Sequence, residues 1–411
     1  MEQPELIPHL FRTEFRKIVA VLCRNFGLDK LELAEDIAGE TFLAAMENWP
    51  YQGIPPSPAG WLHTVARNKA ISLLRRDNIF RDKVAPALRK ESEAVGLLPE
   101  IDLSDLHIRD SQLRMIFAVC HPSIPPESQV ALALRILCGF SAAEIAVAFL
   151  TNPDTISKRI YRAKEKLRDG TVSLDLPDGQ AMGERLGSVL TTLYLLFNEG
   201  YHSVGSHLPY RQELCEEAMR LTQLLLEEPV TCRPEVQAIY ALMCFHSSRF
   251  AARSSETGDP VMLADQDPSL WDQELISRGS WYLKEASRGE YLSKYHLEAA
   301  IAYWHAQPEA GEGKWAQILP LFDRLVEQDG SPVVALNRLY ALAMVKSKAA
   351  ALREAVQLDL PANPYYHSLL AWLLEGTDDE KATAHLERAL ELARNPADRK
   401  TLLKRMGKRE G

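Results

Sequence analysis

The sequence predicts an all-α protein of several domains, and three observations carry that prediction. Apolar residues recur at three- and four-residue spacing in almost every segment, whereas period-two alternation with β-branched residues is scarce. The 21 glycines and 24 prolines fall mostly between the periodic segments, where they end helices. A chain of 411 residues is too long for one ordinary core, so we expect two to four domains.

Composition excludes several classes of protein. With 46% hydrophobic and 25% charged residues, the chain is not disordered, collagen-like or stapled by disulfides. No apolar run approaches the ~18–20 residues that span a bilayer, and no signal peptide is visible, which favours a cytosolic protein. The six cysteines and eleven histidines show no metal-ligand spacing. We therefore expect buried, reduced thiols and neither a metal nor a cofactor.

Charge is distributed unevenly along the chain. The net charge is −9, yet residues 1–170 hold 22 basic and 22 acidic side chains, so the whole excess follows residue 170. Residues 61–90 carry a net charge of +6 and residues 152–168 carry +4, while residues 29–47 are acidic. Two basic stretches and one acidic face indicate two nucleic-acid contacts and a protein-binding surface. Solvated helix faces would produce the same pattern.

Three helices are predicted near the N-terminus, over residues 10–26, 31–47 and about 58–76. In the second helix we expect the carboxylates to face outward and the apolar residues inward, namely Leu33, Ile37, Phe42, Ala45 and Met46. The polar side of the third helix carries mostly basic and amide side chains: His63, Arg67, Asn68, Lys69, Ser72, Arg75 and Arg76.

Aromatic residues bracket the Pro-rich loop before the third helix. They are Trp49, Tyr51 and Trp61. An aromatic platform beside a basic groove suits single-stranded DNA, because any unstacked base can stack on it. Trp49 and Trp61 fit a hydrophobic core equally well, and the sequence leaves both interpretations open.

Residues 140–168 predict a helix-turn-helix. Ser141 and Glu144 form a capping box for its first helix, and Asn152 caps the second, with Pro153 at the first helical position. A basic helix of this kind fits a DNA major groove. The alternative is a generic helical hairpin with a basic exposed side. The turn also departs from the usual pattern, because Leu150 occupies a position where glycine is often found. The second helix should bury Ile156, Ile160, Ala163 and Leu167 and expose Thr155, Ser157, Lys158, Arg159 and Arg162.

These segments together resemble a bacterial sigma factor of the extracytoplasmic-function group, over about residues 10–170. Residues 34–42 are similar to the helix of region 2 that binds core RNA polymerase, and residues 61–68 with 74–76 to the segment that melts and holds the minus-ten element. The helix-turn-helix is similar to region 4, which reads the minus-thirty-five element. The resemblance implies polymerase contacts at Glu35, Asp36, Glu40 and Phe42, minus-ten contacts at Trp61, His63, Arg67, Asn68, Lys69, Arg75 and Arg76, and minus-thirty-five contacts at Thr155, Ser157, Lys158, Arg159 and Arg162.

Residues 114–137 and 193–201 narrow the resemblance to the sigma-factor subgroup with a long helical C-terminal extension, whose end is tetratricopeptide-like. Independently, residues 363–394 have the spacing of a helix pair in a 34-residue repeat, with Tyr366, Leu369, Leu370, Leu373, Ala382, Leu386 and Ala389 as its apolar positions. The expected domains are residues 8–78 (region 2), 79–108 (linker), 109–170 (region 4), 180–290 (helical extension) and 291–411 (tetratricopeptide-like).

The sequence favours a non-enzymatic transcription initiation factor whose partners are core RNA polymerase and promoter DNA. Gly-rich phosphate loops, nucleophile elbows and metal spacings are absent, and residues 198–201 are better explained as a helix boundary or an interdomain contact than as a catalytic group. The acidic extension could fold back on the two basic helices or support the promoter complex. The alternative is a polymerase-independent helix-turn-helix regulator with a helical-repeat sensor domain.

Overall fold

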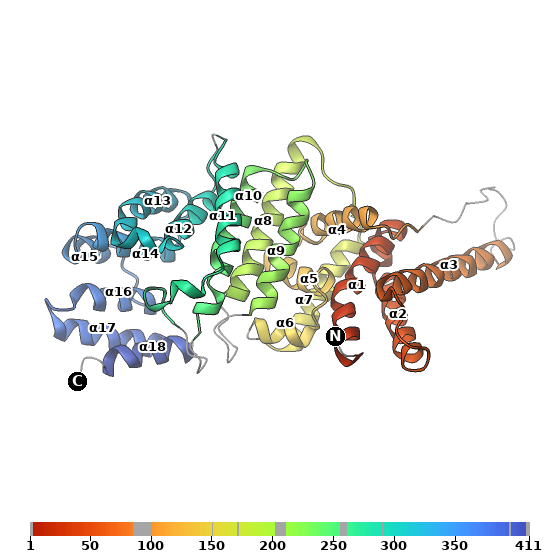
Figure 1. Cartoon of the computed structure of the whole chain (residues 1–411), viewed down its shortest axis with the longest axis horizontal. Helices are drawn as coiled ribbons and strands as arrows, with labels where there is room; N and C mark the ends of the chain where they lie inside the picture. The colour runs from red at the N-terminus through yellow and green to blue at the C-terminus, as the bar shows by residue number, and fades with distance from the viewer. Residues whose placement is uncertain are drawn as a thin grey trace. The chain divides into compact units, whose positions relative to one another are not determined.

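The computed structural model describes residues 3–84, 101–149, 151–170, 172–201, 211–254, 261–289, 291–393 and 396–407. These residues form helices and no β-strand, which confirms the predicted all-α class (Figure 1). The chain divides into two compact units, Met1–Leu195 and Leu196–Gly411, and the boundary falls within helix α8 (Gly179–Tyr201). No helix among the described residues is long and apolar enough to cross a membrane.

The first unit begins with three helices, α1 (Gln3–Phe26), α2 (Leu31–Gln52) and α3 (Pro58–Val84), with a short 3-10 turn η1 (Leu28–Lys30) before α2. Both α2 and α3 extend beyond the predicted bounds, and α3 enters the segment expected to be linker. The core between them is aliphatic and aromatic, because the stripes of all three helices meet there. Its most buried members include Ile18, Leu22, Leu31, Ile37 and Leu62.

The inward position predicted for Met46 is wrong. Its side chain is 56% exposed, and that of Leu43 is 57% exposed. The buried stripe of α2 runs through Ile37, Thr41, Ala45 and Trp49 at four-residue spacing. Met46 follows Ala45 by one residue, which turns it about 100° around the helix and out of the core.

The second group of helices in this unit contains the predicted helix-turn-helix. Its members are α4 (Asp105–Val119), α5 (Pro126–Ile136), α6 (Ala142–Ala148) and α7 (Pro153–Arg168). Both predicted caps are confirmed. The Ser141 backbone N–H donates to Glu144 Oε2 at 2.8 Å while the Glu144 N–H donates to Ser141 Oγ at 3.2 Å. Asn152 Oδ1 accepts from the Thr155 N–H at 2.7 Å. These bonds fix the two helix starts locally.

The second unit is a series of paired helices. α10 (Pro234–Ser247) is its centre, because it is buried along almost its whole length and packs against α9 (Gln212–Glu227), α11 (Gln273–Ala286) and α12 (Lys294–His305). The chain continues through α13 (Lys314–Gln328), α14 (Pro332–Val345), α15 (Lys348–Ala355), α16 (Pro364–Leu374), α17 (Asp379–Leu392) and α18 (Pro396–Gly407).

The predicted C-terminal helix pair is present as α16 and α17, which pack against each other. All seven predicted apolar positions are buried: Tyr366, Leu369, Leu370, Leu373, Ala382, Leu386 and Ala389. Helices α13 and α14 form a second pair of consecutive helices and are also in contact.

Candidate nucleic-acid interface

Helix α7 presents a polar, basic face on one side and an apolar stripe on the other. Ile156, Ile160, Ala163 and Leu167 are at most 7% exposed. The opposite face exposes Ser157, Lys158 and Arg162, with Thr155 and Arg159 half-buried beside them. Arg159 Nη2 lies 3.0 Å from Glu127 Oε2. The arrangement leaves a row of hydroxyl, ammonium and guanidinium donors available to a DNA groove.

Helix α3 carries the second predicted surface. Arg67 and Asn68 are exposed, while Lys69 is half-buried and its Nζ lies 2.9 Å from Glu40 Oε2. Arg75 and Arg76 belong to α3, but their side chains lie outside the described part of the structure.

The aromatic residues near the Pro-rich loop divide into two kinds. Trp49 is 2% exposed, and its ring meets the half-buried ring of Trp61 edge to face, with centroids 5.5 Å apart. Trp49 is therefore a core residue, and Trp61 packs on it with part of its surface still accessible. Tyr51 is 90% exposed and is free of that core.

His63 is held by an acid buried in the neighbouring helix α1. Its Nε2 lies 2.9 Å from Oε2 of Glu14, and Lys17 Nζ lies 2.8 Å from the other carboxylate oxygen. Burial would raise the pKa of Glu14, but the hydrogen bonds from His63 and Lys17 outweigh burial and lower that pKa to about 2. This contact orients the His63 ring on α3.

A cavity of about 360 Å³ lies directly on the polar side of α3. His63 and Arg67 line it from the helix, and residues 101–104, which precede α4, line it from the other side. Ile101 is 2% exposed and anchors this segment. We predicted residues 101–104 to be part of the linker, because nothing in their local sequence pattern indicates that they pack beside a distant helix.

The residues of the acidic helix α2 that are predicted to bind polymerase differ in how exposed their side chains are. Asp36 and Glu40 are exposed, whereas the side chain of Glu35 is 15% exposed. Phe42 is 4% exposed and packs against Phe11, with ring centroids 5.1 Å apart. Phe42 thus supports the helix from inside and cannot reach a partner, so we omit it from the polymerase-binding surface proposed below.

The same helix exposes apolar residues that the sequence analysis missed. Leu43 and Met46 lie on the surface within one to two turns of Glu40, as residues three to six positions apart on a helix can. Exposed apolar side chains rimmed by polar residues are typical of protein docking sites. Asp36, Glu40 and Leu43 are four and three residues apart, and this spacing indicates in the sequence that they share one face of the helix.

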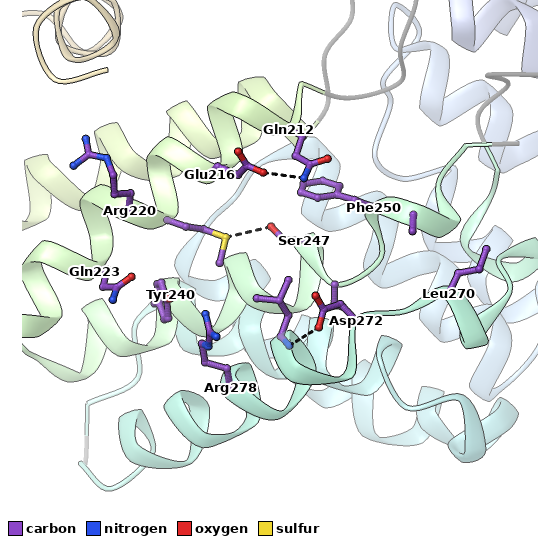
Figure 2. A pocket seen from close by; sticks show the side chains of 14 residues that line it. Gln212, Glu216, Arg220, Gln223, Tyr240, Ser247, Phe250, Leu270, Asp272 and Arg278 are labelled. Carbon is purple, nitrogen blue, oxygen red and sulfur yellow. Dashed lines mark hydrogen bonds between the residues drawn. The ribbon is translucent and has the colours of Figure 1, made fainter. Parts of the chain in front are cut away.

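The second unit contains an open groove of about 510 Å³ between α9 and α11, with α10 beneath it (Figure 2). Its charged side chains already have partners within the chain. Gln212 donates to Glu216 at 2.8 Å, Arg278 Nη2 lies 2.5 Å from Glu274 Oε1, and Asp272 Oδ1 accepts from the backbone N–H groups that begin α11. The groove therefore offers no uncommitted charge for recognising a ligand.

Gly200, in the segment 198–201, is required by close packing between two helices. A Cβ atom there would lie 2.7 Å from Cys215 Sγ and 2.9 Å from the Arg211 carbonyl oxygen. The Arg211 N–H also donates to the Gly200 carbonyl at 2.7 Å. Glycine lets α8 and the start of α9 approach closely, so the structure gives this segment a packing role.

The sequence of the chain matches three known protein families. Residues 10–78 match the family sigma-70 region 2, residues 114–167 match sigma-70 region 4, and residues 185–287 match a family of unknown function, DUF6596. The chain therefore contains sigma-70 regions 2 and 4, which are not enzymatic domains, followed by a helical C-terminal region.

Two relatives are similar to different lengths of the chain. The uncharacterized protein R00370 of Rhizobium meliloti (strain 1021) is 36% identical over 387 residues, which cover 90% of this chain and 88% of that protein. The ECF RNA polymerase sigma factor SigE of Mycolicibacterium smegmatis (strain ATCC 700084 / mc(2)155) is 30% identical over 138 residues, which cover 33% of this chain and 51% of SigE. No solved structure matches the chain.

Proposed function

We propose that this protein binds core RNA polymerase and directs it to promoters, where it starts transcription. The observation that carries the proposal is the two-sided character of α7. Its buried stripe holds the helix-turn-helix together, while Thr155, Ser157, Lys158, Arg159 and Arg162 form the opposite face, which we assign to the minus-thirty-five duplex.

Region 2 supplies the two other proposed contacts. Asp36 and Glu40, with the neighbouring Leu43 and Met46, form the surface that we assign to polymerase, and we assign the partly buried Glu35 to the same surface. The polar side of α3 receives the unpaired bases of the minus-ten element, through Trp61, His63, Arg67, Asn68 and Lys69, with Arg75 and Arg76 further along the helix.

The energetics of strand opening require both kinds of contact. Each base-pair step of DNA loses about 1.4 kcal/mol of stacking when it melts. The phosphate contacts of the basic helices, together with stacking on an aromatic ring at about 1–3 kcal/mol per base, must offset that cost. The cavity beside His63 and Arg67 provides space on the surface where such a base would arrive.

The helical C-terminal extension follows region 4 in the chain. We propose that it modulates initiation through contact with regions 2 and 4, and that its helix pairs α13–α14 and α16–α17 are tetratricopeptide-like. We further propose that the protein acts in the cytoplasm, associated with the nucleoid when polymerase is bound.

Run-off transcription tests the proposal. Purified core polymerase, which alone does not start at specific promoters, is combined with the full chain and with genomic fragments. We expect discrete start sites that depend on the chain, and co-elution of the chain with core polymerase. Binding to palindromic duplex DNA without polymerase, with no chain-dependent start site, would instead identify the polymerase-independent regulator.

A further inference from the structure

The groove between α9 and α11 is lined in part by apolar side chains that remain accessible. Met219 on α9 and Leu275 on α11 are half-buried, and Leu270, just before α11, is 51% exposed. Phe250 and Leu270 lie at one end of the groove, and Tyr240 lies towards the other (Figure 2). Accessible apolar side chains gathered in a polar surround are typical of a protein docking site.

An exposed tryptophan extends this lining along α11. Leu275 and Arg278 line the groove, and Trp281 is the neighbour of Arg278 on the helix surface because it follows three residues later. Its side chain is 56% exposed. The Trp281 ring meets that of Tyr282 edge to face with centroids 4.7 Å apart, and Tyr282 in turn meets Tyr240 at 4.9 Å. Trp, Tyr and Arg are the residue types that most often dominate the binding energy of protein interfaces.

The polar side chains of the groove select against a small charged ligand. Glu216 is bonded to Gln212, Arg278 is paired with Glu274, and Asp272 accepts the N–H groups that begin α11. A small ion would have to break one of these contacts, whereas an apolar side chain packs on the lining without breaking any of them. The groove therefore suits a partner that arrives with an apolar face.

The surroundings of the groove are acidic. Residues 171–290 carry 18 acidic and 9 basic side chains, and α9 alone carries four glutamates and one arginine. The groups that bond to Glu216 and Asp272 are an amide and backbone N–H groups, which leave the negative charge of both carboxylates in place. The field at the rim therefore attracts a basic partner and repels an acidic one.

We propose that this groove, together with Trp281, docks an amphipathic helix of another protein, with the apolar side of that helix in the groove and basic residues on its flanks. Leu275 and Trp281 are six residues apart, which is about 9 Å along α11, and apolar residues at positions i and i+7 of a partner helix span about 10 Å. An extended peptide that adds to a sheet has no edge to join, because the described residues form no strand. The docking surface goes beyond the proposed function, since it uses none of the residues assigned to polymerase or promoter DNA.

A display library of random 16-residue peptides identifies the kind of partner directly. The library is first depleted on the full chain carrying Trp281→Ala and then selected on the full wild-type chain, so that only peptides that need Trp281 are kept. We expect these peptides to share apolar residues at positions i, i+3 or i+4, and i+7, to carry an excess of Lys and Arg, and to become helical on binding, as measured by circular dichroism. Selected peptides that are acidic, or that lack the helical pattern, would overturn the proposal, and so would an empty selection.

A substitution at the other end of the groove tests whether the selected peptides occupy all of it. Leu270→Ser should weaken their binding at least fivefold in fluorescence anisotropy, because it removes an apolar contact about two helical turns from Trp281. Leu403→Ser, at a leucine of α18 that is 53% exposed, and Tyr365→Ala, at an aromatic residue of α16 that is 56% exposed, should leave binding unchanged. Raising the salt concentration from 50 to 500 mM should weaken binding to the wild type about tenfold. Thermal melting checks that every variant folds.

Two further results would contradict the docking of a foreign helix. Equal affinity of Leu270→Ser and Leu403→Ser for the selected peptides would show that the peptides meet Trp281 alone and do not enter the groove. A dimer of the free chain in sedimentation equilibrium that dissociates with Trp281→Ala, but not with Tyr365→Ala, would assign the groove to a second copy of the chain.

Discussion

Gln129 Oε1 on α5 accepts a hydrogen bond from Thr192 Oγ1 on α8 at 2.7 Å, and Ser188 Oγ lies 3.3 Å from the same oxygen. Gln129 is 3% exposed, and its amide nitrogen donates to two backbone carbonyls at the turn before α5. Arg185, also on α8, donates to the Phe117 carbonyl at 2.7 Å. The first half of α8 is therefore part of the folded region 4 domain, although the region 4 match ends at residue 167.

Thr192→Val should lower the free energy of unfolding by about 1 kcal/mol, because the buried Gln129 oxygen loses its shorter hydrogen bond. Thr191→Val is the control, since Thr191 is exposed and bonds only within its own helix. Urea unfolding followed by circular dichroism measures both. Equal stability of the two variants would contradict the importance of this contact.

The Glu14–His63 contact predicts a specific acid sensitivity. The pKa of Glu14 is about 2 in the folded chain against 4.5 for an unperturbed glutamate, so its contribution to stability is complete above about pH 4.5 and is lost as the pH falls towards 2. We expect the free energy of unfolding to fall by about 2 kcal/mol between pH 6 and pH 3 from this group.

Glu14→Gln should remove that part of the pH dependence, whereas Glu47→Gln, at an exposed position on α2, should leave it unchanged. Unfolding curves at several pH values give the comparison. The same acid sensitivity in wild type and Glu14→Gln would show that Glu14 is not the titrating group.

Two glycines of α8 should respond oppositely to alanine. Gly200→Ala places a methyl group against a backbone carbonyl and the buried Cys215, which we expect to cost about 1–3 kcal/mol. Gly187→Ala meets no atom within 4 Å and should stabilise the helix by about 0.5–1 kcal/mol. Thermal unfolding of the two variants decides the sign, and a tolerated Gly200→Ala would refute the close approach of α8 and α9.

The thiols should be unreactive in the folded chain. Burial raises the pKa of Cys120, Cys215 and Cys244 to about 12, so almost no thiolate exists at pH 8. No disulfide joins the six cysteines, and Cys232 is half-buried while the others are buried. Iodoacetamide followed by mass spectrometry should modify Cys232 first and the buried thiols only after denaturation. Rapid native labelling of Cys215 would contradict this burial.

Local patterns could be predicted from the sequence because the interactions that create them are local. Asn152 caps α7 through an N–H three residues away, and the apolar stripe of α7 follows from helical periodicity alone. The prediction for Met46 was wrong because one residue along a helix turns a side chain by about 100°, which is enough to move it from the core to the surface.

Contacts between segments far apart in the chain could not be predicted from the sequence. Lys164 and Glu35 are 129 residues apart, and Glu14 and His63 are 49 apart. A charge pattern indicates that a helix has a basic or an acidic side, but not which other helix it meets. The ion pair between Lys164 on α7 and Glu35 on α2, and the packing of residues 101–104 beside α3, required the structure.

The central claim is that α7 reads one promoter element for the polymerase, and a double-mutant cycle in run-off transcription tests it most directly. Wild-type chain and Arg162→Gln are compared on an intact promoter and on one whose minus-thirty-five element is replaced, with Lys166→Gln as the control. We predict that Arg162→Gln reduces initiation about tenfold on the intact promoter and has little further effect on the replaced one. An equal loss on both promoters, or no loss on either, would contradict the assignment.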